Sequence, residues 1–190
     1  MARNKPKNRT SPRLQRWDYG WAGAYFITIC TKNRAFFFGD IGAGHMQLSS
    51  VGIIADILWH EIRHHAKDIT LGDYIIMPNH VHGIIILEKS GPDARAPMQQ
   101  TTSLSPRTIG QQRFQNQGKN TISSIVGSYK SAVTKHARRL GFEFGWQPRF
   151  HDHIIRNEAA FQTISRYIRN NPKKWPIDTF HPNNPAPPKW

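Results

Sequence analysis

The sequence predicts an α+β fold in which helices pack on a central antiparallel sheet, and three observations support it. A Pro-Asn turn at residues 78–79 separates two β-branched runs, which is typical of an antiparallel hairpin. Apolar residues recur at helical spacing within residues 51–62, 122–133 and 161–168. Strands and helices alternate in the order strand, helix, hairpin, helix, strand, helix, which favours a layered α+β architecture.

The first half of the chain supplies the first strand, the first helix and the hairpin. Residues 24–31 are β-branched and aromatic and predict a strand. Ser49 and Ser50 can cap a helix that runs to about residue 67. The hairpin then follows, with strands over residues 69–77 and 80–87.

The second half begins with a segment that predicts a flexible insertion, because residues 89–119 are rich in Gln, Ser, Pro, Gly and Thr. A helix is expected over residues 121–140, and a strand or extended segment over 144–155. Asn157 can cap a last helix that stops before Pro172. This order of elements is that of a ferredoxin-like sandwich.

Charge and length limit the functions that the chain can have. The 190 residues suit a single domain, here residues 17–175, between a basic arm at 1–16 and a Pro-rich tail at 176–190. Lys and Arg number 26 against 12 Asp and Glu, giving a net charge of +14. Such a charge predicts a polyanionic partner, with nucleic acid ahead of an anionic membrane surface. The single cysteine, and the lack of an apolar leader or membrane span, predict a cytoplasmic protein.

Two histidines open the second strand of the hairpin, in the sequence His80-Val81-His82. Side chains alternate between the faces of a strand, so both histidines point one way and Val81 the other. Two such imidazoles can bind one metal ion, or they can be hydrogen-bonded residues at the start of a strand. They are too few for a structural zinc site, so an oxygen donor and open positions would suit Mg²⁺ or Mn²⁺.

The last helix carries a second pair of reactive side chains. Tyr167 and Asn171 are four residues apart and share one helix face. A phenol oxygen can be a covalent nucleophile when a metal or base assists it, and the Asn171 carbonyl is a hard oxygen donor. Alternatively, Tyr167 packs at the edge of the core and Asn171 ends the helix before Pro172. The residues alone leave both interpretations open.

Several basic residues are candidates for contacts with nucleic acid. Arg149 and Arg156 flank an aromatic segment whose rings can stack on bases or pack in the core. His153 points away from Asp152 and can contact the scissile region or orient a ligand. The residues predicted to contact nucleic acid are Arg13, Arg16, Lys130, Arg149, His153 and Arg156.

Three motifs together resemble the REP-associated tyrosine transposases. These are HUH-type relatives of insertion-sequence transposases that act on single-stranded DNA. The resemblance covers about residues 18–175 and is carried by the order and spacing of the motifs. They are Met77-Pro78-Asn79-His80-Val81-His82-Gly83, then Trp146-Gln147-Pro148-Arg149-Phe150-His151-Asp152-His153-Ile154-Ile155-Arg156-Asn157, and then Tyr167-Ile168-Arg169-Asn170-Asn171-Pro172.

This resemblance implies a ferredoxin-like fold and a metal-dependent reaction on DNA. By it, His80 and His82 bind a divalent metal, Asn171 is suited to be a third ligand, and Tyr167 is the nucleophile. Attack on a phosphodiester would give a 5′-phosphotyrosine bond and a free 3′-hydroxyl, and rejoining would reverse the step. The implied substrate is a short palindromic DNA hairpin with a guiding tetranucleotide, and a monomer is favoured over a homodimer.

Two other functions stay open at this point. One is a DNA-binding protein without catalysis, whose mechanism would rest on charge and aromatic side chains alone. The other is a metal-dependent hydrolase that activates water and forms no covalent intermediate. A trapped protein–DNA adduct distinguishes both from a tyrosine nuclease.

Overall fold

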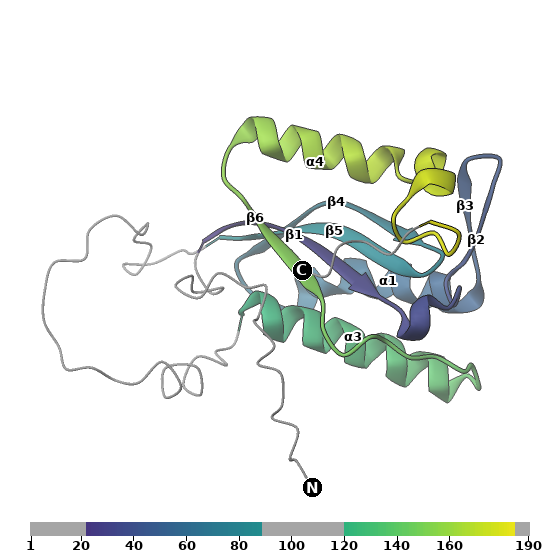
Figure 1. Cartoon of the computed structure of the whole chain (residues 1–190). Coiled ribbons are helices and arrows are strands. Elements are labelled where there is room, and N and C mark those ends of the chain that lie inside the picture. The colour runs from purple at the N-terminus through teal and green to yellow at the C-terminus, as the bar shows by residue number, and fades with distance from the viewer. Residues whose placement is uncertain (1–21, 89–119, 185–190) are drawn as a thin grey trace, which may run out of the picture.

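A four-stranded antiparallel sheet is the centre of the computed structural model, which describes residues 22–88 and 120–184 (Figure 1). Its strands lie in the order β4-β5-β1-β6, and every neighbouring pair is antiparallel. The predicted α+β, ferredoxin-like fold is confirmed. The strands are β1 Gly23–Cys30, β4 Ile69–Met77, β5 His80–Leu87 and β6 His151–Ile155.

Helices cover both faces of this sheet. Figure 1 shows α1 (Ser50–His65) and α3 (Ile122–Arg139) on one face and α4 (Glu158–Asn170) on the other. Each begins at a residue whose side chain accepts a hydrogen bond from the first helical turn, as N-capping requires. These caps are Ser49, Thr121 and Asn157, which accept from the backbone nitrogens of Gly52, Ser124 and Ala160.

The sheet separates two apolar cores of unequal size. The larger core lies between the sheet and the helices α1 and α3, and the smaller one lies under α4. Because side chains alternate along β5, Val81 enters the larger core and Ile84 the smaller one. Strand β5 is therefore covered on both faces, and polar side chains that point towards α4 are shielded from water.

Gly83 lets helix α1 approach the sheet closely. A Cβ atom at this position would lie 2.2 Å from Cζ2 of Trp59, a contact that real Cβ atoms do not make. Trp59 is 1% exposed and stacks on Tyr74, with ring centroids 5.5 Å apart. Gly83, which follows the histidine pair, thus allows α1 to pack closely against β5.

Some elements of the structure were not predicted from the sequence. A small hairpin, β2 (Gly39–Gly42) and β3 (His45–Leu48), precedes α1. The segment 144–155, expected as a strand or extended chain, is a strand from His151, and the aromatic rings of residues 144–150 pack on the larger core from irregular backbone. Short 3-10 helices, η1 (Lys32–Arg34) and η2 (Pro172–Ile177), complete the described chain.

The predicted basic arm, residues 1–16, and the predicted insertion, 89–119, lie outside the described residues. Within 22–88 and 120–184, no helix has the length and apolar character needed to cross a bilayer. Residues 176–184, the first part of the predicted Pro-rich tail, are described, and the Phe180 carbonyl accepts a hydrogen bond from the side chain of Asn79.

Candidate active site

The two histidines of the His80-Val81-His82 motif lie at the start of β5 and face helix α4. Their side chains are 0% and 1% exposed, and their ring centroids are 4.5 Å apart. Val81 between them points into the larger core, as alternation along a strand requires. Both imidazoles therefore lie on one face of the sheet, as predicted.

His80 has one satisfied and one unsatisfied ring nitrogen. Its Nδ1 lies 2.8 Å from Oδ1 of Asn79. Its Nε2 is buried and has no hydrogen-bond partner among the described residues. Burial lowers the pKa of His80 well below its usual value, assisted by the charges of His82 and Arg34. A neutral imidazole with a free, buried nitrogen is suited to bind a metal ion.

Both ring nitrogens of His82 have hydroxyl partners. Nδ1 lies 2.9 Å from Oγ1 of Thr28, which is directly across the strand pair on β1. Nε2 lies 3.1 Å from the hydroxyl of Tyr167 on α4. Burial lowers the pKa of His82 to about 3, against a smaller opposing effect of a backbone hydrogen bond with Ile27. The ring is neutral at physiological pH.

Tyr167 reaches the histidine pair from α4, 85 positions away in the sequence from His82. Its ring meets that of Phe26 edge to face, with centroids 6.2 Å apart, and 37% of the residue is exposed. Burial, helped by the Asp178 carboxylate and opposed by the Asn171 amide, raises the pKa of Tyr167 to about 12. The tyrosine is therefore protonated at neutral pH, accessible from solvent and aimed at the motif.

Asn171 follows one helical turn after Tyr167 and is completely buried. Its amide lies close enough to Tyr167 and Asp178 to lower the pKa of both groups. Even so, neither Oδ1 nor Nδ2 has a partner at hydrogen-bond distance in the described structure. Buried polar atoms are normally paired, so the amide of Asn171 and Nε2 of His80 are two buried groups that a bound ligand could satisfy.

The chemistry of these unpaired atoms indicates whether the site could hold a divalent metal ion. Among the described residues, no group of three or more His, Cys, Asp or Glu side chains could hold a metal ion. A site here would instead use His80, His82 and the amide oxygen of Asn171. Two imidazoles with one neutral oxygen leave positions open for a substrate, which suits Mn²⁺ or Mg²⁺ better than structural zinc.

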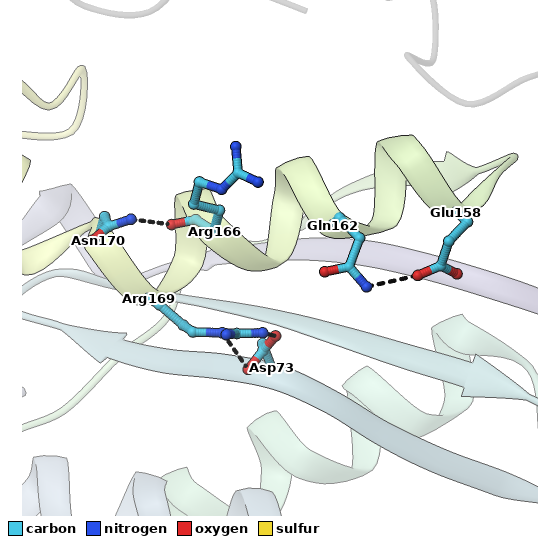
Figure 2. Close-up of polar contacts among 6 residues, drawn as sticks. All are labelled: Asp73, Glu158, Gln162, Arg166, Arg169 and Asn170. Carbon is cyan, nitrogen blue, oxygen red and sulfur yellow. Dashed lines mark hydrogen bonds and ion pairs between the residues drawn. The ribbon is translucent and has the colours of Figure 1, made fainter.

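Helix α4 is held against the sheet by a paired ionic contact (Figure 2). Nε and Nη2 of Arg169 donate to the two carboxylate oxygens of Asp73 on β4, at 3.1 and 2.9 Å. Within α4 itself, Gln162 donates to Glu158 at 2.6 Å, and Asn170 donates to the Arg166 carbonyl at 2.9 Å. The two-point contact of Arg169 restrains the rotation of the helix that carries Tyr167.

The chain after α4 adds residues that sequence reasoning missed. The Phe180 ring lies over the histidine pair, with centroids 4.5 Å from His80 and 5.8 Å from His82. Trp175 is buried 6.1 Å from the His80 ring, and Asp178 is 7% exposed. This Pro-rich stretch has neither helical nor strand periodicity, so its contacts with the histidines could not be predicted from sequence pattern.

The predicted nucleic-acid contacts are only partly near this site. Arg149 and His153 are exposed at β6, where His153 pairs with Phe26 and so lies on the α4 face. Arg156 is exposed at the far end of the strand. His151, not singled out from the sequence, pairs with Thr28 and thus lies one strand away from His82.

Lys130, in contrast, lies on the opposite side of the sheet. Its Nζ donates to the Gln147 carbonyl at 2.7 Å, and its main-chain carbonyl accepts from the Trp146 indole at 3.0 Å. The structure does not bring Lys130 to the histidine pair, and its contact with nucleic acid stays a prediction. Arg13 and Arg16 lie outside the described residues.

The other tyrosines in the described chain have structural contacts away from the pair. Tyr129 is 3% exposed and donates to the Ala55 carbonyl at 3.0 Å, under α1. Tyr74 bonds to Asp56 and His60 of α1, each at 2.8 Å. Tyr25 is buried in the larger core. Of the tyrosines described, Tyr167 alone bonds to a motif histidine.

Comparison with known proteins places the chain among its relatives. No family model matches it. An uncharacterized protein of Haemophilus influenzae is 36% identical over 176 residues, which make up 92% of this chain and 93% of that protein. The chain belongs to the same family as this Haemophilus protein. The match spans nearly the whole of both chains, so the two share one domain organisation.

The fold of this chain is similar to that of a REP-associated tyrosine transposase. A solved structure of such a transposase bound to a REP hairpin matches with a TM-score of 0.55 and 18% sequence identity. The match covers 86% of this chain and 74% of that one. It confirms the fold that the three sequence motifs implied.

Proposed function

We propose that this protein is a metal-dependent endonuclease and strand transferase for single-stranded DNA, with Tyr167 as its nucleophile. The observation that carries the proposal is the 3.1 Å hydrogen bond between the Tyr167 hydroxyl and Nε2 of His82. It joins a partly exposed phenol to a buried imidazole pair through elements far apart in the sequence. A tyrosine that merely filled the edge of the core would not need its hydroxyl there.

The metal proposal rests on the donor set already described. His80 offers an unpaired Nε2, and Asn171 offers an unpaired amide oxygen, both buried. A divalent ion bound by these groups and His82 would polarise a phosphate oxygen and favour the deprotonated phenol. Mn²⁺ and Mg²⁺ are the proposed ions, because both accept imidazole and oxygen ligands with open positions.

In the proposed reaction, the Tyr167 oxygen attacks the phosphorus of a DNA phosphodiester. A phosphorus–oxygen bond to the phenol forms, and the bond to the 3′ oxygen of the leaving strand breaks. The phenol loses its proton, and the released 3′ oxygen gains one. The 5′-phosphotyrosine bond keeps the energy of the phosphodiester, so a 3′-hydroxyl can reverse the step without an external energy source. Helix α4 holds the nucleophile in register with the histidines, as proximity catalysis requires.

Hairpin DNA is the proposed substrate. The structural neighbour binds a REP hairpin, and the net charge of +14 favours a polyanion. Arg149 and His153 are exposed, and His153 lies on the α4 face through its pairing with Phe26. We propose that both contact the DNA strand, with Arg13, Arg16 and Arg156 as further contacts. Exposed bases near the cleavage point would favour single-stranded over plain duplex DNA. We propose that the protein acts as a monomer.

A covalent-adduct assay tests the proposal. Labelled hairpin DNA with single-stranded flanks is incubated with Mn²⁺ and the wild-type protein, Tyr167→Phe or Tyr129→Phe. We expect a detergent-resistant adduct with wild type and Tyr129→Phe, and none with Tyr167→Phe. DNA cleavage without any adduct would support a hydrolase instead. Binding without cleavage would support a protein that only binds DNA.

A further inference from the structure

Asn79 lies between the first motif histidine and the chain that follows α4. Its side chain is 1% exposed and makes two hydrogen bonds. Oδ1 lies 2.8 Å from Nδ1 of His80, and Nδ2 donates to the carbonyl of Phe180 at 2.8 Å. Its own carbonyl accepts from the backbone nitrogen and the hydroxyl of Thr31, at 2.9 and 3.0 Å. The residue is thus fixed at both its main chain and its side chain.

The Phe180 carbonyl determines which way the Asn79 amide faces. A carbonyl oxygen can only accept a hydrogen bond, so the amide NH₂ must point towards it. If the amide were turned over, its oxygen would face the Phe180 oxygen, and two buried acceptors would oppose each other. The observed orientation therefore gives both the oxygen and the nitrogen of the Asn79 amide a partner, and it directs Oδ1 at His80.

This orientation in turn determines which nitrogen of His80 carries the proton. Because Oδ1 is an acceptor, Nδ1 must be the N–H donor of the 2.8 Å bond. A proton on Nε2 as well would be a buried donor, since that atom has no partner among the described residues. The neutral ring then has its lone pair on the buried Nε2.

We propose that Asn79 is a positioning residue, which holds His80 in the Nδ1–H tautomer under the control of the Phe180 carbonyl. The tautomer follows from hydrogen bonding alone, whereas its use, presenting Nε2 to a divalent cation, rests on the proposed function. Histidines that bind metals commonly donate their other N–H to such an acceptor. The contact also gives residues 178–181 a role in building the site.

His82 provides an internal comparison. Its two partners are hydroxyl groups, of Thr28 and Tyr167, and a hydroxyl can donate or accept. Neither partner alone forces one tautomer on this ring. A change at Asn79 should therefore alter His80 and leave His82 as it was.

The experiment uses the full chain, labelled with ¹⁵N-histidine and free of metal. Long-range ¹H–¹⁵N spectra at neutral pH distinguish a protonated ring nitrogen from one with a lone pair. In the wild type we expect His80 to carry its proton on Nδ1. Asn79→Leu, of similar size, removes the acceptor and should give His80 a mixture of tautomers. Asn79→Asp keeps an oxygen towards Nδ1 and should keep that nitrogen protonated.

Mn²⁺ titration calorimetry on the same proteins measures the consequence. Asn79→Leu should weaken Mn²⁺ binding about 10- to 100-fold, the usual effect of losing such a partner, and Asn79→Asp should restore most of it. A wild-type spectrum with the proton on Nε2 of His80 would overturn the proposal, whether or not the Leu variant folds. So would a folded Asn79→Leu protein with unchanged tautomer and affinity. If the tautomer is as expected but DNA is never cleaved, the nuclease proposal fails and the role of Asn79 stands.

Discussion

Removing the hydroxyl of Tyr167 should strengthen metal binding while it abolishes cleavage. In the metal-free protein, Nε2 of His82 and the hydroxyl of Tyr167 are hydrogen-bonded at 3.1 Å. A metal bound at Nε2 would need the lone pair of that nitrogen, so this hydrogen bond would have to break first. A hydrogen bond of this kind contributes about 0.5–1.5 kcal/mol net. Since about 1.4 kcal/mol is a tenfold change, Tyr167→Phe should bind Mn²⁺ about two- to twelve-fold more tightly.

Titration calorimetry without DNA measures this affinity directly. Tyr129→Phe is the matched control, because its hydroxyl bonds to the Ala55 carbonyl under α1, far from the histidines. Its Mn²⁺ affinity should equal that of the wild type. Weaker binding by Tyr167→Phe would mean that the phenol oxygen is itself a ligand, and it would refute the idea that hydroxyl and metal compete for His82.

Three further predictions concern the histidines, the packing of the sheet and the cysteine. His80→Ala and His82→Ala should abolish cleavage but leave most DNA affinity intact, since phosphate contacts supply the bulk of it; cleavage that persists in excess chelator would contradict this. Gly83→Ala should lower the free energy of unfolding by about 1–3 kcal/mol, because its methyl group overlaps the α1 indole. Gly127→Ala, with nothing within 4 Å, should slightly stabilise the protein in the same denaturant titration. Burial raises the pKa of Cys30 to about 11 from 9.0, so iodoacetamide at about pH 8 should alkylate it roughly a hundredfold more slowly than an ordinary thiol; a normal rate in the folded protein would argue against that shift.

Much of the fold could be predicted because local sequence agrees with tertiary structure in these segments. The Pro78-Asn79 turn sets both ends of the β4–β5 hairpin, and the predicted bounds coincide with the observed strands. Capping side chains mark the starts of the three long helices. The alternation rule was enough to place His80 and His82 on one face.

The missed elements lack such local signals. Strands β2 and β3 are only four residues each, and their turn uses Ala43 and Gly44, both with positive φ, instead of a Pro- or Asn-containing turn. Trp146 and Phe150 were compatible with stacking on bases or packing inside, and the structure places both on the larger core. Aromatic content alone could not separate these outcomes, because both use the same ring surface.

The site itself was only partly accessible to sequence reasoning. Tyr167 and Asn171 could be placed on one helix face, but which strand they met depended on the family resemblance. Phe180 reaches the histidines, and Asp178 lies near Tyr167, through the chain after α4, where no helical or strand periodicity predicts which way a side chain points. The hydrogen bond from Asn79 to the Phe180 carbonyl spans 101 residues and exists only because the chain folds back.

Mapping the covalent adduct to one side chain tests directly whether Tyr167 is the nucleophile. The protein is trapped on hairpin DNA with Mn²⁺, then digested with nuclease and trypsin, and its peptides are analysed by mass spectrometry. Trypsin cuts after Arg166 and Arg169, so the short peptide Tyr167-Ile168-Arg169 isolates the proposed nucleophile. We expect a nucleotide 5′-phosphate on Tyr167 in this peptide. A phosphonucleotide on any other residue, or cleaved DNA with every tyrosine peptide unmodified, would contradict it.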